Sequence, residues 1–163
     1  MDILAAHVGG LLKSHGMMLA TAESCTGGAV SAAITDIAGS SAWFERGFVT
    51  YANAAKVEML GVNQATLERY GAVSEAVVRE MATGALLRSH AQFAVAVSGI
   101  AGPDGGTPDK PVGTIWFAWA RKHGEVVARL HHIAGGRGEV RAQSVHIALQ
   151  GVSDLLNQQT LLA

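Results

Sequence analysis

Short apolar runs alternate with segments of helical periodicity along the whole chain, and this alternation limits the fold to the α/β class. Residues 17–22 and 93–98 form apolar runs that are typical of buried strands. Residues 44–52 are rich in β-branched and aromatic side chains, which favours a third strand. The apolar spacing of residues 3–14 and the alanine-rich stretch of residues 27–37 predict helices beside these strands.

The second half of the chain ends in a hairpin and a helix. Residues 114–120 and 125–132 predict two strands, and the short connection between them favours an antiparallel pair. This order predicts a mixed sheet with helices on both faces, built as a single domain over residues 1–163. The remaining helices are predicted over residues 53–60, 63–70, 75–89 and 137–157.

The charge balance argues against recognition of a polyanion by a global field. The formal net charge is −1, and only 15% of the residues are charged. We therefore expect no nucleic-acid partner and no membrane partner. No apolar run approaches the ~20 residues of a membrane span, and the first residues lack the cationic start of a secretory signal. A cytoplasmic protein is expected, and its one cysteine leaves no intrachain disulfide.

A turn rich in hydroxyls and glycine follows the first predicted strand. Ser24 and Cys25 are both placed to act as nucleophiles there, and Thr26, Gly27 and Gly28 open the next helix. The first amides of a helix lack partners within it, so they favour an anion or a developing oxyanion. The alternative is a purely structural role in which Ser24 or Thr26 only caps the helix. For Cys25 we favour a buried structural role, because no histidine lies nearby to pair with it.

A second segment joins the strand over residues 44–52 to the following helix. Asn53 is a candidate cap for that helix, and Lys56 lies in its first turn. A cation there opposes the helix dipole, and with partial burial the pKa of the lysine would fall toward neutrality. A neutral amine can take the proton of a serine hydroxyl. The alternatives are a solvated surface lysine at position 56 and a core aromatic at Tyr51.

Residues 99–113 form a long loop of glycine, proline and aspartate after the strand that ends at Ser98. The loop is not a P-loop, because Lys110 is followed by Pro111 instead of a serine or threonine. Long loops without secondary structure of their own are usually functional or mobile. We expect this loop to cover a substrate, with a wide surface turn as the alternative.

The predicted last helix begins with two arginines four residues apart. Arg137 and Arg141 share a helix face close to free amides, which favours a phosphate or carboxylate. The alternative is a solvated helix face. The seven histidines form no metal pattern, since His131 and His132 are neighbours on a strand and face opposite sides. We therefore expect no metal site.

Six motifs occur in order along the chain, and together they are far more specific than any one of them. The series resembles the CinA C-terminal domain family, also called the PncC family of nicotinamide mononucleotide amidohydrolases. The resemblance extends from about residue 3 to residue 156. Its motifs are TAESCTGG at residues 21–28, GFVTYANAAK at 47–56, GAVSE at 71–75, SGIAGPDGG at 98–106, KPVG at 110–113 and EVR at 139–141.

The resemblance implies a three-layer α/β/α sandwich and a serine amidase. It implies that the substrate is nicotinamide mononucleotide, which loses its carboxamide nitrogen as ammonia, and that no cofactor takes part. It assigns Ser24 as nucleophile, Lys56 as base and Tyr51 as proton relay or orienter. Family members often carry aspartate at the position of Gly136, which this chain lacks. The predicted substrate-binding residues are Thr26, Gly27, Gly28, Ser98, Gly99, Gly102, Gly105, Arg137 and Arg141.

Two other functions stay open from the sequence. One is a binding module that holds a pyridine nucleotide or a stress-related partner without cleaving it. The other is a different amidase or esterase on the same scaffold. A homodimer is expected from the apolar surplus and the resemblance.

Overall fold

A computed structural model describes residues 1–162 of the chain, with side chains as far as Gln158, and its elements follow the predicted alternation. Within the described part, none of the helices has the length and apolar character that a membrane crossing requires. The strands are β1 (Leu19–Glu23), β2 (Phe44–Val49), β3 (Phe93–Gly99), β4 (Thr114–Arg121) and β5 (Val126–His132). The helices are α1 (Asp2–Ser14), α2 (Ala29–Thr35), the 3₁₀ turn η1 (Ser40–Ala42), α3 (Asn53–Leu60), α4 (Gln64–Tyr70), α5 (Glu75–Leu87) and α6 (Arg137–Leu162).

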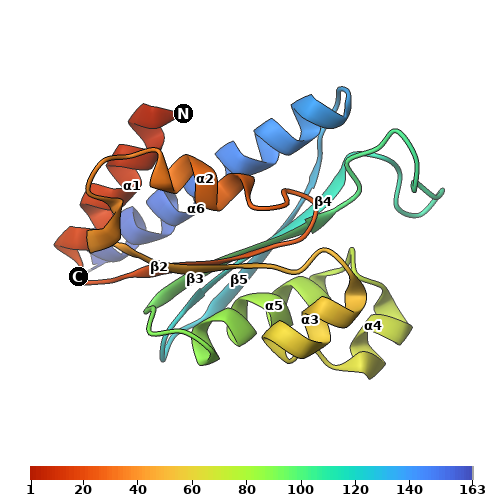
Figure 1. Ribbon diagram of the computed structural model, residues 1–163, viewed down its shortest axis with the longest axis horizontal. Helices are drawn as coiled ribbons and strands as arrows, with labels where there is room; N and C mark the ends of the chain where they lie inside the picture. Colours follow the sequence, from red (N-terminus) through yellow and green to blue (C-terminus); the bar gives the residue numbers. More distant parts are fainter. Residues whose placement is uncertain (163) are drawn as a thin grey trace.

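The strands form one mixed sheet in the order β2-β1-β3-β4-β5. The strand β1 runs parallel to both of its neighbours, whereas β4 runs antiparallel to β3 and β5. Helices α1, α2 and α6 cover one face and α3, α4 and α5 cover the other (Figure 1). The predicted mixed α/β/α sandwich and the antiparallel hairpin of β4 and β5 are therefore confirmed.

The first strand sends alternate side chains into two separate cores. Leu19 packs with apolar residues of α1, α2 and α6, while Ala20 and Ala22 pack with those of α5. Thr21 follows the parity of Leu19, and its hydroxyl lies 2.8 Å from that of Ser31 on α2. Successive strand residues point to opposite faces. The residues that end β1 are therefore divided between the two helical layers.

Several element boundaries differ from the sequence-based expectation, and two of these differences have a clear local reason. The strand predicted to reach residue 52 ends at Val49, because its register partner Glu23 is the last residue of β1. The helix predicted to begin at residue 27 begins at Ala29, because Gly27 and Gly28 have φ values of 60° and 103°. Glycine adopts this left-handed region without the steric cost that a Cβ would bring.

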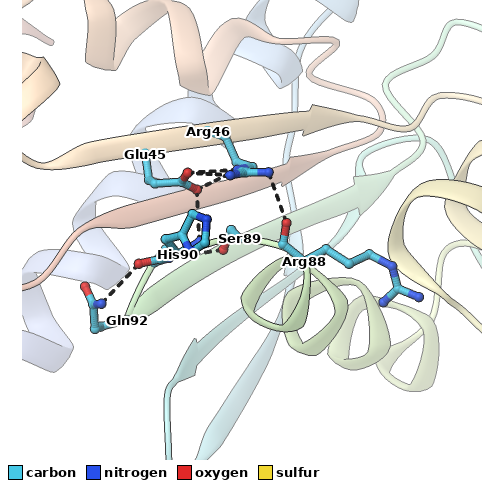
Figure 2. A network of polar contacts seen from close by, with 7 residues as sticks. Glu45, Arg46, Arg88, Ser89, His90 and Gln92 are labelled. Carbon is cyan, nitrogen blue, oxygen red and sulfur yellow. Dashed lines mark hydrogen bonds and ion pairs between the residues drawn. The ribbon is translucent and has the colours of Figure 1, made fainter.

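A polar network lies around the first residues of β2 (Figure 2). The Glu45 carboxylate accepts hydrogen bonds from the Arg46 guanidinium and from the backbone amide of His90. Arg46 also donates to the carbonyl of Arg88 at 3.2 Å. These bonds hold an edge strand to the connection between α5 and β3. The network is structural and lies away from the opposite, carboxyl ends of the parallel strands.

Candidate active site

The carboxyl ends of β1, β2 and β3 meet at one edge of the sheet and surround a cavity of about 280 Å³. Ligands of open α/β sheets bind at this edge, outside the strand ends. Segments from α3, the α4–α5 connection, the loop after β3 and the start of α6 complete the wall. The lining residues are Ser24, Cys25, Tyr51, Asn53, Lys56, Ala72, Val73, Ser98, Gly99, Ile100, Ala101, Gly102, Asp104, Gly105 and Arg137.

The side chains of Ser24 and Lys56 meet at the floor of this cavity. Lys56 Nζ lies 3.0 Å from Ser24 Oγ, and the lysine side chain is 1% exposed. The Ser24 amide donates to the carbonyl of Val97 on β3, which fixes the serine backbone against the sheet. The alternative of a solvated surface lysine is therefore wrong, because α3 carries Lys56 inward.

The surroundings of Lys56 favour its neutral form. Burial lowers the pKa of its ammonium from 10.5 to about 8. Nζ also donates to the carbonyls of Thr50 at 2.8 Å and Tyr51 at 3.0 Å. A neutral amine has two hydrogens and one lone pair, so these two carbonyls leave the lone pair facing Ser24 Oγ. The arrangement suits a base that accepts the serine proton.

Tyr51 reaches the lysine through its backbone instead of its phenol. Its side chain is exposed and lines the cavity, and its hydroxyl lies 3.4 Å from a guanidinium nitrogen of Arg137. The alternative of a core aromatic is wrong, because β2 ends before this residue and releases it to the cavity mouth. The direct contact between Lys56 and Ser24 needs no phenol between them.

Cys25 is buried beside the serine, and its surroundings disfavour the reactive thiolate form. Burial is the largest influence on its thiol and raises the pKa from 9.0 to about 11. Only about one molecule in ten thousand then carries a thiolate at pH 7, and the thiolate is the nucleophilic form. The preferred structural role of this cysteine is supported by both observations.

Cys25→Ala is therefore expected to keep the amidase activity that the motif resemblance implies within about twofold of wild type, while losing about 1 kcal/mol of stability through the lost packing. Iodoacetamide at pH 7 should leave the wild-type enzyme active for the same reason. Initial rates of ammonia release and thermal melting measure the two effects. A loss of activity above tenfold in a folded Cys25→Ala variant would assign the thiol a chemical role.

The first amides of α2 are occupied, contrary to the expectation that they are free for an oxyanion. The carboxylate of Glu23 accepts from the amides of Val30 at 2.8 Å and Ser31 at 3.0 Å. The hydroxyl of Thr26 also donates to this carboxylate, at 2.7 Å. Thr26, Gly27 and Gly28 form the turn behind the nucleophile, and the structure does not bring them to the cavity wall. Within the turn of residues 24–28, the amides of Ser24 and Gly27 donate to carbonyls, whereas those of Cys25, Thr26 and Gly28 have no acceptor in another described residue.

The two arginines of α6 lie in different places although they share a helix face. Arg137 lines the cavity and donates to the carbonyl of Gly102 at 2.8 Å. Arg141 does not reach the cavity, because its guanidinium donates to the carbonyls of Cys25 and Thr26, both at 3.1 Å. Arg141 thereby holds the nucleophile turn. Gly136 stands where family members often carry aspartate, and its amide donates to the carboxylate of Glu139 at 3.1 Å.

Gly99 at the end of β3, and Gly102 and Gly105 in the loop after it, line the cavity. Ser98 also lines it, but its hydroxyl donates to the carbonyl of Ala72 at 2.8 Å and so fixes the α4–α5 connection.

Asn53 and Asp104 line the cavity without having been singled out as ligands. Asn53 was predicted as a helix cap, but Ala52 holds that position and Asn53 is the first residue of α3. Ala72 and Val73 belong to the GAVSE motif, which was the one sequence signal for them. Over the described residues, no three His, Cys, Asp or Glu side chains are grouped to hold a metal ion.

Comparison with known proteins assigns the family. The model of the CinA C-terminal domain matches residues 1–156. The chain belongs to the CinA C-terminal domain family. A relative from Escherichia coli K12, named nicotinamide-nucleotide amidohydrolase PncC, is 56% identical over 157 residues, which cover 96% of this chain and 95% of the relative. A relative of the same name from Enterobacter agglomerans is 58% identical over 147 residues, or 90% of each chain.

The fold of the family is also known from solved structures. The competence/damage inducible protein CihA from Agrobacterium tumefaciens is 48% identical and superposes with a TM-score of 0.91, over 96% of this chain and 94% of that one. The resemblance read from the six motifs is therefore confirmed at the level of the CinA C-terminal domain family.

Proposed function

We propose that this chain hydrolyses the carboxamide of nicotinamide mononucleotide to nicotinic acid mononucleotide and ammonia, with Ser24 as the nucleophile. The observation that carries the proposal is the 3.0 Å contact between Ser24 Oγ and a buried lysine amine, at the floor of the cavity. The printed name of its 56–58% identical relatives, nicotinamide-nucleotide amidohydrolase, supports the same substrate class.

The first chemical step joins the serine to the carboxamide carbon. Neutral Lys56 takes the proton of Ser24 as Oγ attacks, and the carbonyl oxygen gains a negative charge. The amide of Cys25 is the candidate donor to that oxyanion, because Cys25 lines the cavity and the helix amides beyond it are held by Glu23. One well-placed donor of this kind contributes about 3–4 kcal/mol to the transition state.

The second step breaks the carbon–nitrogen bond and releases ammonia. The Lys56 ammonium returns its proton to the leaving nitrogen, and an acyl-serine remains. A water molecule then attacks the acyl carbon while Lys56 accepts its proton, and Ser24 recovers its hydrogen as the carboxylate product leaves. The positive charge of the pyridinium ring makes its carboxamide carbon more electrophilic.

Arg137 is the proposed phosphate partner. It is the arginine of α6 that lines the cavity, whereas the guanidinium of Arg141 is bound to backbone carbonyls. The loop that follows Gly99 and contains Gly102 and Gly105 is proposed to close over the nucleotide. In this proposal Thr26, Gly27, Gly28 and Arg141 act by shaping the nucleophile turn.

Purified protein is expected to release ammonia and nicotinic acid mononucleotide in equal amounts from nicotinamide mononucleotide, with or without a metal chelator. Ammonia is measured by a coupled assay and the product by chromatography. Nicotinamide, nicotinamide riboside and a simple ester serve as comparison substrates. Faster turnover of another substrate would indicate a different amidase or esterase. Binding of the nucleotide without any ammonia release would indicate a binding module.

We further propose that the enzyme serves pyridine-nucleotide salvage in the cytoplasm and acts as a homodimer. Exposed apolar side chains such as Leu130 on the edge strand β5 are compatible with a subunit contact. Sedimentation of the purified protein measures the oligomeric state, and a monomer at assay concentrations would contradict the dimer.

A further inference from the structure

A fully buried carboxylate lies directly before the nucleophile, and among the described side chains no cationic group is bonded to it. Glu23 is 1% exposed and ends β1. A buried charge of this kind is costly unless hydrogen bonds compensate for it. Its partners are therefore informative about what it does.

Four hydrogen bonds converge on this carboxylate. Oε1 accepts from the hydroxyl of Thr26 at 2.7 Å and from the amide of Val30 at 2.8 Å. Oε2 accepts from the amide of Ser31 at 3.0 Å and from its hydroxyl at 2.7 Å. Bonds to an ionised acceptor are stronger than neutral ones. The side chain of Glu23 thus fastens the end of β1 to the first turn of α2, on both sides of the turn that carries Ser24.

Strand parity separates this anchor from the chemistry. Glu23 has the parity of Leu19 and Thr21, so its side chain enters the layer of α2. Ser24 is the next residue, and its hydroxyl faces Lys56 on α3, in the opposite layer. The carboxylate therefore holds the nucleophile from behind without touching the cavity, whose lining does not include Glu23.

The backbone of Glu23 also reaches the base. Its carbonyl accepts from the amide of Thr50 at 2.8 Å, and the carbonyl of Thr50 accepts from Lys56 Nζ. Gly47 on β2 leaves room for the network, since a Cβ there would come within 2.5 Å of Ser31 Oγ and 2.6 Å of Thr21 Oγ1. Strand β1, helix α2 and the end of β2 thus meet around Glu23.

We propose that Glu23 is a positioning residue, whose carboxylate sets the geometry of Ser24 toward Lys56 and the substrate carbon. The proposal rests on the proposed function of Ser24 as nucleophile. Displacement of a reacting group by about 1 Å can cost about 100-fold in rate. The effect should therefore fall on kcat, because Glu23 contacts neither the cavity nor the substrate.

Glu23→Gln is a sharp test, because glutamine has the same shape but one acceptor oxygen. Each carboxylate oxygen holds a backbone N–H that cannot reverse its role, from Val30 on one side and Ser31 on the other. Either orientation of the amide therefore turns its NH₂ toward an N–H. We expect kcat for nicotinamide mononucleotide to fall by about 100-fold, with KM within threefold of wild type.

A second readout does not depend on the substrate. A fluorophosphonate forms a bond from phosphorus to an activated serine oxygen and releases fluoride, and mass spectrometry locates the modified peptide. We expect the labelling rate of Ser24 to fall in Glu23→Gln by the same factor as kcat. If this variant does not fold, Ser31→Ala takes its place, because it removes one hydroxyl bond to Glu23 and leaves the amide. Its labelling should be about fivefold slower, and unchanged labelling would contradict the proposal.

Glu80→Ala is the matched control. Glu80 also holds a helix start, accepting from the amide of Asn63 at 2.8 Å and the hydroxyl of Thr66 at 2.7 Å, but it lies outside the cavity. Its loss should lower the melting temperature and leave kcat per folded molecule unchanged. Equal losses of activity in both variants, in proportion to the unfolded fraction, would reduce Glu23 to a purely structural role.

The remaining outcomes separate the two proposals. A folded Glu23→Gln variant within threefold of wild type in both readouts overturns the role of Glu23 and leaves the proposed function intact. Wild-type protein that is labelled at Ser24 but releases no ammonia overturns the substrate, while slower labelling of Glu23→Gln would still support positioning. The absence of both labelling and ammonia release overturns both proposals.

Discussion

Ser24→Ala is expected to lower kcat for ammonia release from nicotinamide mononucleotide by about 10⁴-fold or more, with the fold unchanged. The hydroxyl supplies the oxygen that bonds to the carboxamide carbon, and no neighbouring group replaces it. Cys25 adjoins it, but burial raises the pKa of that thiol to about 11. The Ser24 amide still donates to Val97, so the turn should keep its shape. Initial rates and the far-UV spectrum of the variant measure the two quantities.

Ser144→Ala is the matched control for the loss of a buried serine hydroxyl. Ser144 is fully buried on α6, and its hydroxyl donates to the carbonyl of Val140 within the same helix. Its replacement should leave kcat within about twofold of wild type, because it touches neither the cavity nor the nucleophile turn. A folded Ser24→Ala variant with more than 1% of wild-type turnover would contradict the serine mechanism.

The fold was largely predictable because the local sequence patterns indicate the same strands and helices that the sheet and its two helical layers contain. Apolar runs marked the buried strands, and β1 and β3 are buried almost throughout their length. One boundary error fell where the pairing of strands decides where a strand ends. Thr50 and Tyr51 have strand-forming side chains, yet the neighbouring strand β1 ends at Glu23. Its carbonyl accepts from the amide of Thr50, and no residue of β1 lies beyond it to pair with the residues that follow. A rule based on one segment has no access to the length of the strand beside it.

The site was predictable in its residues and less so in their arrangement. The motif resemblance drew attention to Ser24 and Lys56, which lie 32 residues apart and meet because β1 and β2 are neighbours in the sheet. Arg137 and Arg141 were expected to act together. The two residues lie about 6 Å apart along α6, roughly one helical turn. Arg137 therefore lies at the cavity, whereas Arg141 lies at the carbonyls of Cys25 and Thr26.

The role of Glu23 had no signal of its own in the sequence. A carboxylate before a serine at a strand end is as easily a solvated side chain as a buried one. Its importance appears only once strand parity places it beneath α2, where two backbone amides need an acceptor. The oxyanion was predicted at the amides that open the helix, around Thr26–Gly28. Because α2 begins later and Glu23 holds amides of its first turn, the proposed oxyanion site moves back to the amide of Cys25.

Lys56→Met is expected to lower kcat/KM by about 10³-fold or more, because methionine fills a similar volume and cannot accept a proton. In the wild type, burial lowers the pKa of Lys56 to about 8. The base must be neutral, so kcat/KM should rise about tenfold per pH unit below pH 8 and level off above it. Lys13→Met makes the same change on an exposed part of α1 and should leave both the rate and the pH profile unchanged.

The same pKa also predicts how stability depends on pH. Between pH 8 and 10.5 the folded lysine is neutral while the unfolded lysine still binds a proton. The unfolded state therefore binds more protons, and the free energy of unfolding should rise with pH across this window. Relative to Lys56→Met, the rise should total about 3 kcal/mol, measured by urea unfolding at a series of pH values. A flat difference between the two proteins, together with a rate profile that is level from pH 6 to 9, would mean that Lys56 is not the base. A rise in stability with a level rate profile would show a buried lysine that takes no part in the chemistry.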